Sequence, residues 1–157
     1  MTRMMIAAAL LAVVAGGCSK PAAVEDELAD GNGVSLRNLT ASNVAVPAEG
    51  REMRVRGTVI PTPSDSKSTY YLLRERRAVG GTIIAILREE RDGRVAYART
   101  EIDCTKRLFH VLGVGASRAS AEIQTASDGP LRSMDGLPLR QELGGYICKR
   151  AGTPLKG

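Results

Sequence analysis

The residues that could carry out chemistry in this chain are few, and their spacing limits what they can do. Three cysteines, Cys18, Cys104 and Cys148, accompany a single histidine, His110. A Cys-x-x-Cys redox pair is absent, and with one histidine a Cys/His cluster for zinc lacks ligands. The pentapeptide Gly-x-Ser-x-Gly, which would present a hydrolase nucleophile, does not occur either. These patterns predict no metal and no cofactor.

Two carboxylates come close to an acid/base arrangement. Glu101 and Asp103 share one face of a predicted strand, but Arg99 and Lys106 beside them favour ordinary surface ion pairs. We therefore expect no catalytic residue and no enzyme.

His110 and a glycine pair also have simpler explanations than chemistry. His110 shares a strand face with Leu108 and Leu112, which favours a structural histidine. Neither a Lys-Ser/Thr pair nor a third glycine follows Gly113-Val114-Gly115 at phosphate-loop or dinucleotide spacing, so this tripeptide is predicted to be a turn.

The N-terminus has the organisation of an export signal. Arg3 supplies a short positive region, residues 4–14 are apolar, and Ala15-Gly16-Gly17 are small residues of the kind that a signal peptidase needs. The apolar run is too short for a spanning helix, which needs about 20 residues. Cleavage before Cys18 is therefore expected, with residues 1–17 removed.

The residues around the cleavage position resemble the lipobox of bacterial lipoproteins. The match is Val14-Ala15-Gly16-Gly17-Cys18, although Ala15 stands where leucine is usual. The resemblance implies a lipid on Cys18, palmitate included, and attachment to a membrane. Because two or more acyl chains anchor stably, this attachment would be permanent. Ser19 resembles a sorting signal for the outer membrane, facing the periplasm or the surface. The alternative is a plain secretory signal followed by a chance cysteine.

With Cys18 carrying lipid, Cys104 and Cys148 are an even pair in an oxidising compartment. We predict that they form a disulfide. Closing a loop of this length stabilises a domain by at most about 4 kcal/mol in the chain-entropy model.

Charge and composition divide the mature chain. The formal net charge of +5 becomes +4 when the signal containing Arg3 is removed. A basic protein favours acidic partners, but this charge is too diffuse to select one class of partner. We do not expect a nucleic acid among them. No aromatic residue precedes Tyr70. We expect a lipoprotein signal at 1–17, a flexible tether at 18–50, a sheet-based domain at 51–151 and a tail at 152–157.

The domain has the pattern of an antiparallel sheet. Strands are predicted at 53–59, with Val59 on its apolar face, and at 69–77, 82–90, 94–103 and 106–111. Asp92-Gly93 favours a two-residue type I′ turn, which sets Leu87 opposite Ala98 and turns Cys104 inward. The register across Gly80-Gly81 stays open, because neither a two- nor a three-residue loop turns Tyr71 and its neighbours inward without burying an arginine.

The remaining elements are two helices. Ser117 is the predicted N-cap of a short helix that runs to about Thr125, and residues 139–147 have apolar side chains at helical spacing. The fold class is therefore α+β: an antiparallel meander of four to five strands, one short helix, and a C-terminal helix stapled by the disulfide.

The outer sheet face is the candidate binding surface. Arginine and tyrosine are residues that interfaces favour, and aliphatic neighbours add apolar area. The face comprises Ile84, Ile86, Arg88, Tyr97 and Arg99. The alternative is that a strand or the C-terminal segment covers this face, or that solvent does.

About 80 residues resemble the small Gram-negative envelope proteins related to surface-adhesin protein E. The resemblance rests on Tyr70-Tyr71-Leu72-Leu73-Arg74, on 80–88, on 97–104 with its acid-x-x-Cys end, and on Tyr146-Ile147-Cys148. It implies a sheet with flanking helices, a disulfide, and a surface protein that binds host or envelope partners.

These observations together predict a non-enzymatic, membrane-anchored envelope lipoprotein that binds a protein partner. One alternative is an accessory subunit of a secretion or conjugation apparatus. Another is an inhibitor of an envelope enzyme such as lysozyme, although the basic charge of most lysozymes would oppose a +4 inhibitor.

Overall fold

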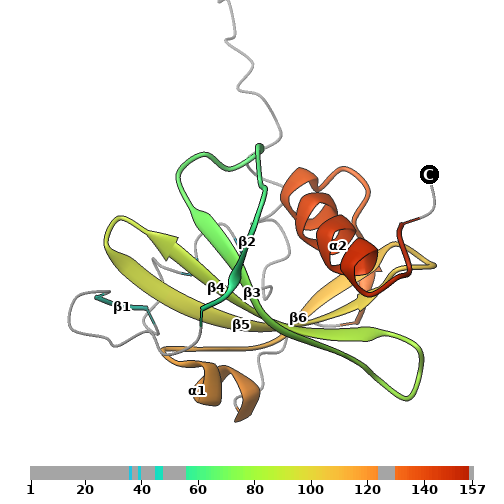
Figure 1. Ribbon diagram of the computed structural model, residues 1–157, viewed down its shortest axis with the longest axis horizontal. Coiled ribbons are helices and arrows are strands. Elements are labelled where there is room, and N and C mark those ends of the chain that lie inside the picture. Colours follow the sequence, from blue (N-terminus) through green and yellow to red (C-terminus); the bar gives the residue numbers. More distant parts are fainter. Residues whose placement is uncertain (1–35, 37–38, 40–44, 48–55, 124–129, 156–157) are drawn as a thin grey trace, which may run out of the picture.

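The computed structural model describes residues 36, 39, 45–47, 56–123 and 130–155. One antiparallel sheet forms its centre, with a helix on each face (Figure 1). Its strands follow the path β2-β3-β4-β5-β6-β7, and β1 pairs with β5 off this path. The predicted α+β meander is therefore confirmed, but the sheet has seven strands where four to five were expected. The two additional strands, β1 (Val46–Pro47) and β7 (Arg132–Ser133), are too short to show an alternating pattern.

The central hairpin joins β4 (Ile83–Arg91) to β5 (Arg94–Asp103) as predicted. Asp92 and Gly93 both adopt positive φ, 49° and 71°, which a type I′ turn requires. Arg91 consequently pairs with Arg94, Leu87 with Ala98, and Ile83 with Ile102. The register inferred from the turn residues is therefore correct over the whole hairpin.

The hairpin from β3 (Thr69–Arg77) to β4 contains a bulge that the sequence pattern could not reveal. Leu72 pairs with Leu87 and Arg74 with Ile86, so Leu73 is skipped in the register. An extra residue in one strand reverses the alternation beyond it. Tyr71 and Arg74 can then share the outer face while Leu72 faces inward, which no regular register would allow.

Two strand predictions need correction. Val59 of β2 (Thr58–Ile60) is exposed and Ile60 is buried, the reverse of the expected parity, because Ile60 pairs with buried Tyr70. Met53 and Val55 lie outside the described residues. Strand β6 (Leu108–Gly115) continues through the glycines that were expected to form a turn.

The two helices lie on opposite faces of the sheet (Figure 1). Helix α2 (Pro138–Arg150) covers the inner face, where Leu139, Leu143 and Ile147 join the main core. Helix α1 (Arg118–Ile123) packs on the outer face against β5 and β6. The predicted continuation of α1 to Thr125 lies outside the described residues.

The packed domain extends beyond both of its expected limits. Leu36 and Leu39 are buried in the main core, and Val46 contributes to a smaller cluster on the outer face. The region expected as a tether to residue 50 therefore enters the domain by Leu36. Leu155 of the expected tail also packs against the core. Isolated apolar residues in a polar region have no period, so only tertiary packing identifies them as core.

A buried polar network holds Leu36, the first described residue of the chain that packs into the domain. The single hydroxyl proton of Tyr70 is shared between Asp65 Oδ2 at 2.9 Å and the Leu36 carbonyl oxygen at 3.3 Å, while Ser68 Oγ donates to Glu89 Oε1 at 2.8 Å. Burial raises the pKa of Tyr70, and the negative charges of Glu89 and Asp65 raise it further. The hydroxyl therefore stays protonated and keeps donating to the carboxylate and the carbonyl.

The predicted disulfide between Cys104 and Cys148 is present, with Cα atoms 5.7 Å apart. Cys104 follows the last residue of β5, and Cys148 lies in the final turn and a half of α2. The bond therefore fastens α2 to the sheet at one end of the strands. Both sulfurs belong to the buried core, which favours a structural role over redox exchange.

We predict that the Cys104→Ser/Cys148→Ser variant is less stable than the parent. The bond closes a loop of 44 residues, for which the chain-entropy model gives about 4 kcal/mol. Urea unfolding followed by circular dichroism measures the difference. The parent treated with reductant is the control and should unfold at the same midpoint as the variant. A loss below about 1 kcal/mol would contradict the prediction.

Candidate functional site

The predicted outer-face residues do lie together, but most are used inside the fold. The Arg88 residue is only 6% exposed. Its guanidinium carbon lies 4.2 Å from the centroid of the Tyr71 ring, and its Nε lies 2.9 Å from Glu90 Oε1. A buried arginine that is stacked and paired has little left for a partner. Arg88 is therefore a structural residue rather than part of an open surface.

The other members of the expected face are covered to different degrees. Ile86 is fully buried, and Tyr97 is buried in a small cluster with Val95 and Ala121 of α1. Ile84 is half-buried. The central part of this face is therefore covered by α1, and not by a strand or the C-terminal segment, which were the covers expected.

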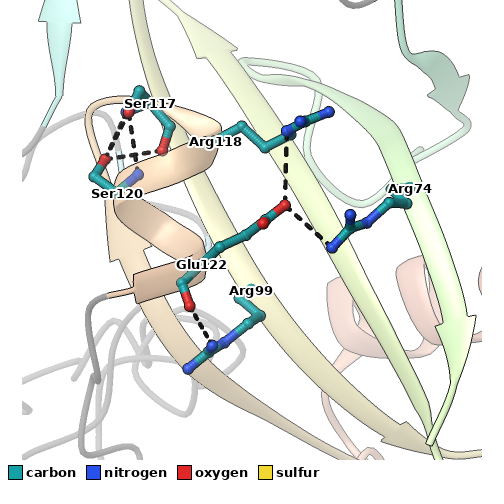
Figure 2. Close-up of polar contacts among 6 residues, drawn as sticks. All are labelled: Arg74, Arg99, Ser117, Arg118, Ser120 and Glu122. Carbon is teal, nitrogen blue, oxygen red and sulfur yellow. Dashed lines mark hydrogen bonds and ion pairs between the residues drawn. The ribbon is translucent and has the colours of Figure 1, made fainter.

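Arg99 holds that cover in place. Its guanidinium donates to the carbonyl oxygen of Glu122 in α1 (Figure 2). Its Nη2 also lies 3.5 Å from the carbonyl oxygen of Leu112. Leu112 is skipped in the register between β5 and β6. Arg99 therefore bridges a strand irregularity and the last turn of α1, and it acts as a positioning residue.

The start of α1 is capped as predicted, by a reciprocal pair of serines. The Ser120 amide donates to Ser117 Oγ at 3.1 Å, and the Ser117 amide donates to Ser120 Oγ at 2.9 Å (Figure 2). This arrangement satisfies helix N-terminal donors in the manner of a capping box. Gly115 makes the close approach possible, since a Cβ there would lie 2.7 Å from the Ala121 amide nitrogen.

Two arginines that sequence reasoning left out form the accessible polar cluster on this face. Arg74 Nη2 lies 3.2 Å and Arg118 Nε 3.6 Å from the same oxygen, Glu122 Oε1. Figure 2 shows the Glu122 carboxylate between the two guanidinium groups. The side chains of Arg74, Arg118 and Glu122 are 49%, 43% and 29% exposed.

The electrostatics of this cluster favour an anionic group from outside. Two positive charges share one carboxylate, which leaves an excess of one. Each guanidinium has five N–H donors, and its fork matches carboxylate, sulfate or phosphate oxygens. Ile123 follows directly and is 81% exposed. We call Arg74, Arg118, Glu122 and Ile123 the α1 patch.

The remaining chemical candidates have structural roles in the described residues. Glu101 accepts a hydrogen bond from Thr82 Oγ1 at 2.7 Å and lies 3.9 Å from His110 Nδ1. Asp103 Oδ1 accepts from the amides of Thr105 and Lys106, which shapes the turn before β6. Over the residues that the structure describes, no group of three His, Cys, Asp or Glu side chains could hold a metal ion.

The α1 patch had a partial signal in the sequence. Arg118 and Glu122 are spaced i,i+4, the separation at which helical side chains meet, and Ser117 predicted the helix that carries them. Arg74 had no such signal, because the bulge at Leu73 decides its face. That α1 folds back over the strands was also invisible to local pattern.

No family model, curated protein or solved structure matches this chain. Among the described helices, none is both long enough and apolar enough to span a bilayer.

We predict that Arg99→Ala loosens α1. Removing a charged donor to two carbonyl groups should lower the unfolding free energy by about 1.5–3 kcal/mol. Amide hydrogen exchange, read by NMR or mass spectrometry, should accelerate in residues 118–123 more than elsewhere. Arg118→Ala, which alters only a surface ion pair, is the matched control and should change stability by no more than about 0.5 kcal/mol. Equal protection of α1 in the parent and in Arg99→Ala would show that Arg99 does not hold the helix.

Proposed function

We propose that this protein is a lipid-anchored, non-enzymatic envelope lipoprotein that binds a protein partner through the α1 patch. The observation that carries the proposed binding is the exposure of Ile123 at 81%, in the residue directly after Glu122, whose carboxylate two arginines share. An exposed aliphatic residue and accessible arginines on the same short helix and its neighbouring strand are a combination that protein interfaces favour. The partner should therefore present an acidic group next to an apolar pocket.

The ion pairs already present do not oppose such binding. Exposed pairs of this kind contribute about 0–1 kcal/mol, so Arg74 or Arg118 can exchange Glu122 for a carboxylate of the partner at small cost. The patch is also held in place before binding, because Arg99 fixes the end of α1 and Ser117 caps its start. A surface that is ordered in advance loses less entropy on association.

The proposed attachment to an envelope membrane rests on the export signal at 1–17 and on Cys18. The buried disulfide supports it, since such bonds persist in oxidising compartments outside the cytoplasm. Eighteen peptide units separate Cys18 from Leu36, which limits the distance between the lipid and the packed domain to about 65 Å. The partner is therefore expected on or near the same membrane, facing the periplasm or the surface.

Adhesion, which the protein E resemblance implies, is one specific form of this proposal. A subunit role in a secretion or conjugation apparatus is another. They differ in the partner: a host protein in the first case, and a stoichiometric envelope component that co-purifies in the second.

We predict that the mature protein begins at an acylated Cys18. Expressed in a Gram-negative host, the parent should fractionate with membranes, and mass spectrometry of its N-terminal peptide should show the mass of attached acyl chains. Cys18→Ser should remove both signals and leave the Cys104–Cys148 disulfide unchanged. A parent chain with an intact Met1 and free thiols at residues 104 and 148 would refute the proposed location.

We predict that the α1 patch carries partner affinity. A photo-reactive residue at position 123 should cross-link a partner in envelope extracts, which mass spectrometry then identifies. Titration of the purified partner should give an affinity that the Arg74→Ala/Arg118→Ala variant lowers about 10- to 100-fold, the loss typical of interface arginines.

The control for this experiment changes the same charge elsewhere. Lys106→Ala/Lys149→Ala removes two positive charges far from α1 and should leave the affinity within about twofold, as expected for positions outside an interface. Equal affinities for the parent and the Arg74→Ala/Arg118→Ala variant would rule out the α1 patch, while the outcome for Cys18 would stand separately.

A further inference from the structure

The tip of the β3–β4 hairpin presents an apolar residue that the fold does not use. Val79 is fully exposed, more than any other large hydrophobic residue in the described part of the chain. Gly80 and Gly81 follow it and have open space around them, with Gly81 at a φ of 83°. Hydrogen bonds between Ala78 and both Thr82 and Gly81 close the loop. A single valine is therefore held outward at a narrow, ordered tip.

Basic residues surround this tip. Arg76 and Arg77 are the exposed last residues of β3, and Arg77 donates to the Ala151 carbonyl at the end of α2 at 2.7 Å. That bond brings exposed Lys149 to the same end of the molecule. In Figure 1 the β3–β4 hairpin extends past the sheet on the side where α2 ends.

The charges at this end do not cancel. Three nearby cations have carboxylate partners: Arg150 with Glu75 at 2.7 Å, Lys106 with Asp103 at 3.7 Å, and Arg107 with Asp135 at 3.2 Å. Glu101, further along the outer face, lies beside His110. In the part of the chain that the structure describes, Arg76, Arg77 and Lys149 form no ion pair with a carboxylate. The surplus positive charge therefore lies at the end of the sheet that carries Val79.

We propose that this hairpin end, made of Arg76, Arg77, Val79 and Lys149, docks on the surface of an anionic phospholipid bilayer. Cationic side chains near such a surface are attracted to its lipid phosphates, and an apolar tip can enter the headgroup region. An acidic protein would also complement the charge. The bilayer is favoured because the apolar group is a single protruding tip rather than a broad face.

The chain can reach the bilayer in this orientation. The nine residues of β3 span about 30 Å, so the hairpin tip lies about that far from the network of Tyr70 and Leu36 at the other end of the strand. A lipid on Cys18 allows up to about 65 Å before Leu36. The domain can therefore lie along the membrane with its tip in contact. This reach depends on the proposed lipid at Cys18, whereas the surface itself is independent of the α1 patch.

The test uses the mature chain with Cys18→Ser, exported so that its disulfide forms, and vesicles of phosphatidylglycerol with phosphatidylcholine. Sedimentation should show binding to the anionic vesicles, no binding to pure phosphatidylcholine, and a decrease as salt rises. Arg76→Gln/Arg77→Gln/Lys149→Gln should lower the partition coefficient about 100-fold, since each basic residue contributes about fivefold. Val79→Ser should weaken binding without changing its salt dependence.

The matched control removes the same charge at the opposite end of the sheet. Lys67→Gln/Arg91→Gln/Arg94→Gln should reduce binding less than tenfold, through the general loss of charge alone. Circular dichroism should show every variant folded. Equal losses in the two triple variants would mean diffuse attraction and would overturn the proposal. So would an absence of binding to anionic vesicles. Neither result bears on partner binding by the α1 patch.

Discussion

The register of the β4–β5 hairpin is the constraint on which the rest of the structure depends. Positive φ at Asp92 and Gly93 closes the hairpin in two residues, and side chains alternate from there along both strands. A slip of one residue would exchange the two faces. Cys104 would then point away from α2, and Arg99 would enter the apolar core. Turn geometry thus decides which groups can meet the disulfide partner and which can hold α1.

Two arginines next to the sheet on the outer face make their contacts within the fold. Arg88 stacks on Tyr71 and pairs with Glu90, while Arg99 donates to the backbone of α1. Each guanidinium group has a partner close to the sheet, because a buried charge without partners would be costly. The accessible arginines lie one layer further out, on the bulged part of β3 and on α1. The α1 patch therefore lies over arginines that are already engaged inside the fold.

The two ends of the sheet differ in chemistry. At the end where β3 begins, the carboxylates of Asp65 and Glu89 are buried beside the Tyr70 hydroxyl, which is bonded to Leu36. At the other end, β3 and α2 finish in exposed basic residues around Val79. The chain thus enters the domain at the end with the buried carboxylates and presents its cationic, apolar tip at the opposite one.

Sequence alone determined the features governed by short-range geometry. The two-residue turn set the central register, the serine at 117 marked a helix start, and the leucine spacing from 139 onward identified α2. The alternation of side chains along β5 predicted that Cys104 faces inward, where its disulfide partner Cys148 lies. Tertiary structure decided what depends on distant segments: the bulge at Leu73 that turns Arg74 outward, the burial of Leu36 and Leu39, and the folding of α1 over Arg99. A bulge adds one residue without altering composition, and an isolated leucine has no period. Their positions follow from packing between segments far apart in the chain, which local pattern does not encode.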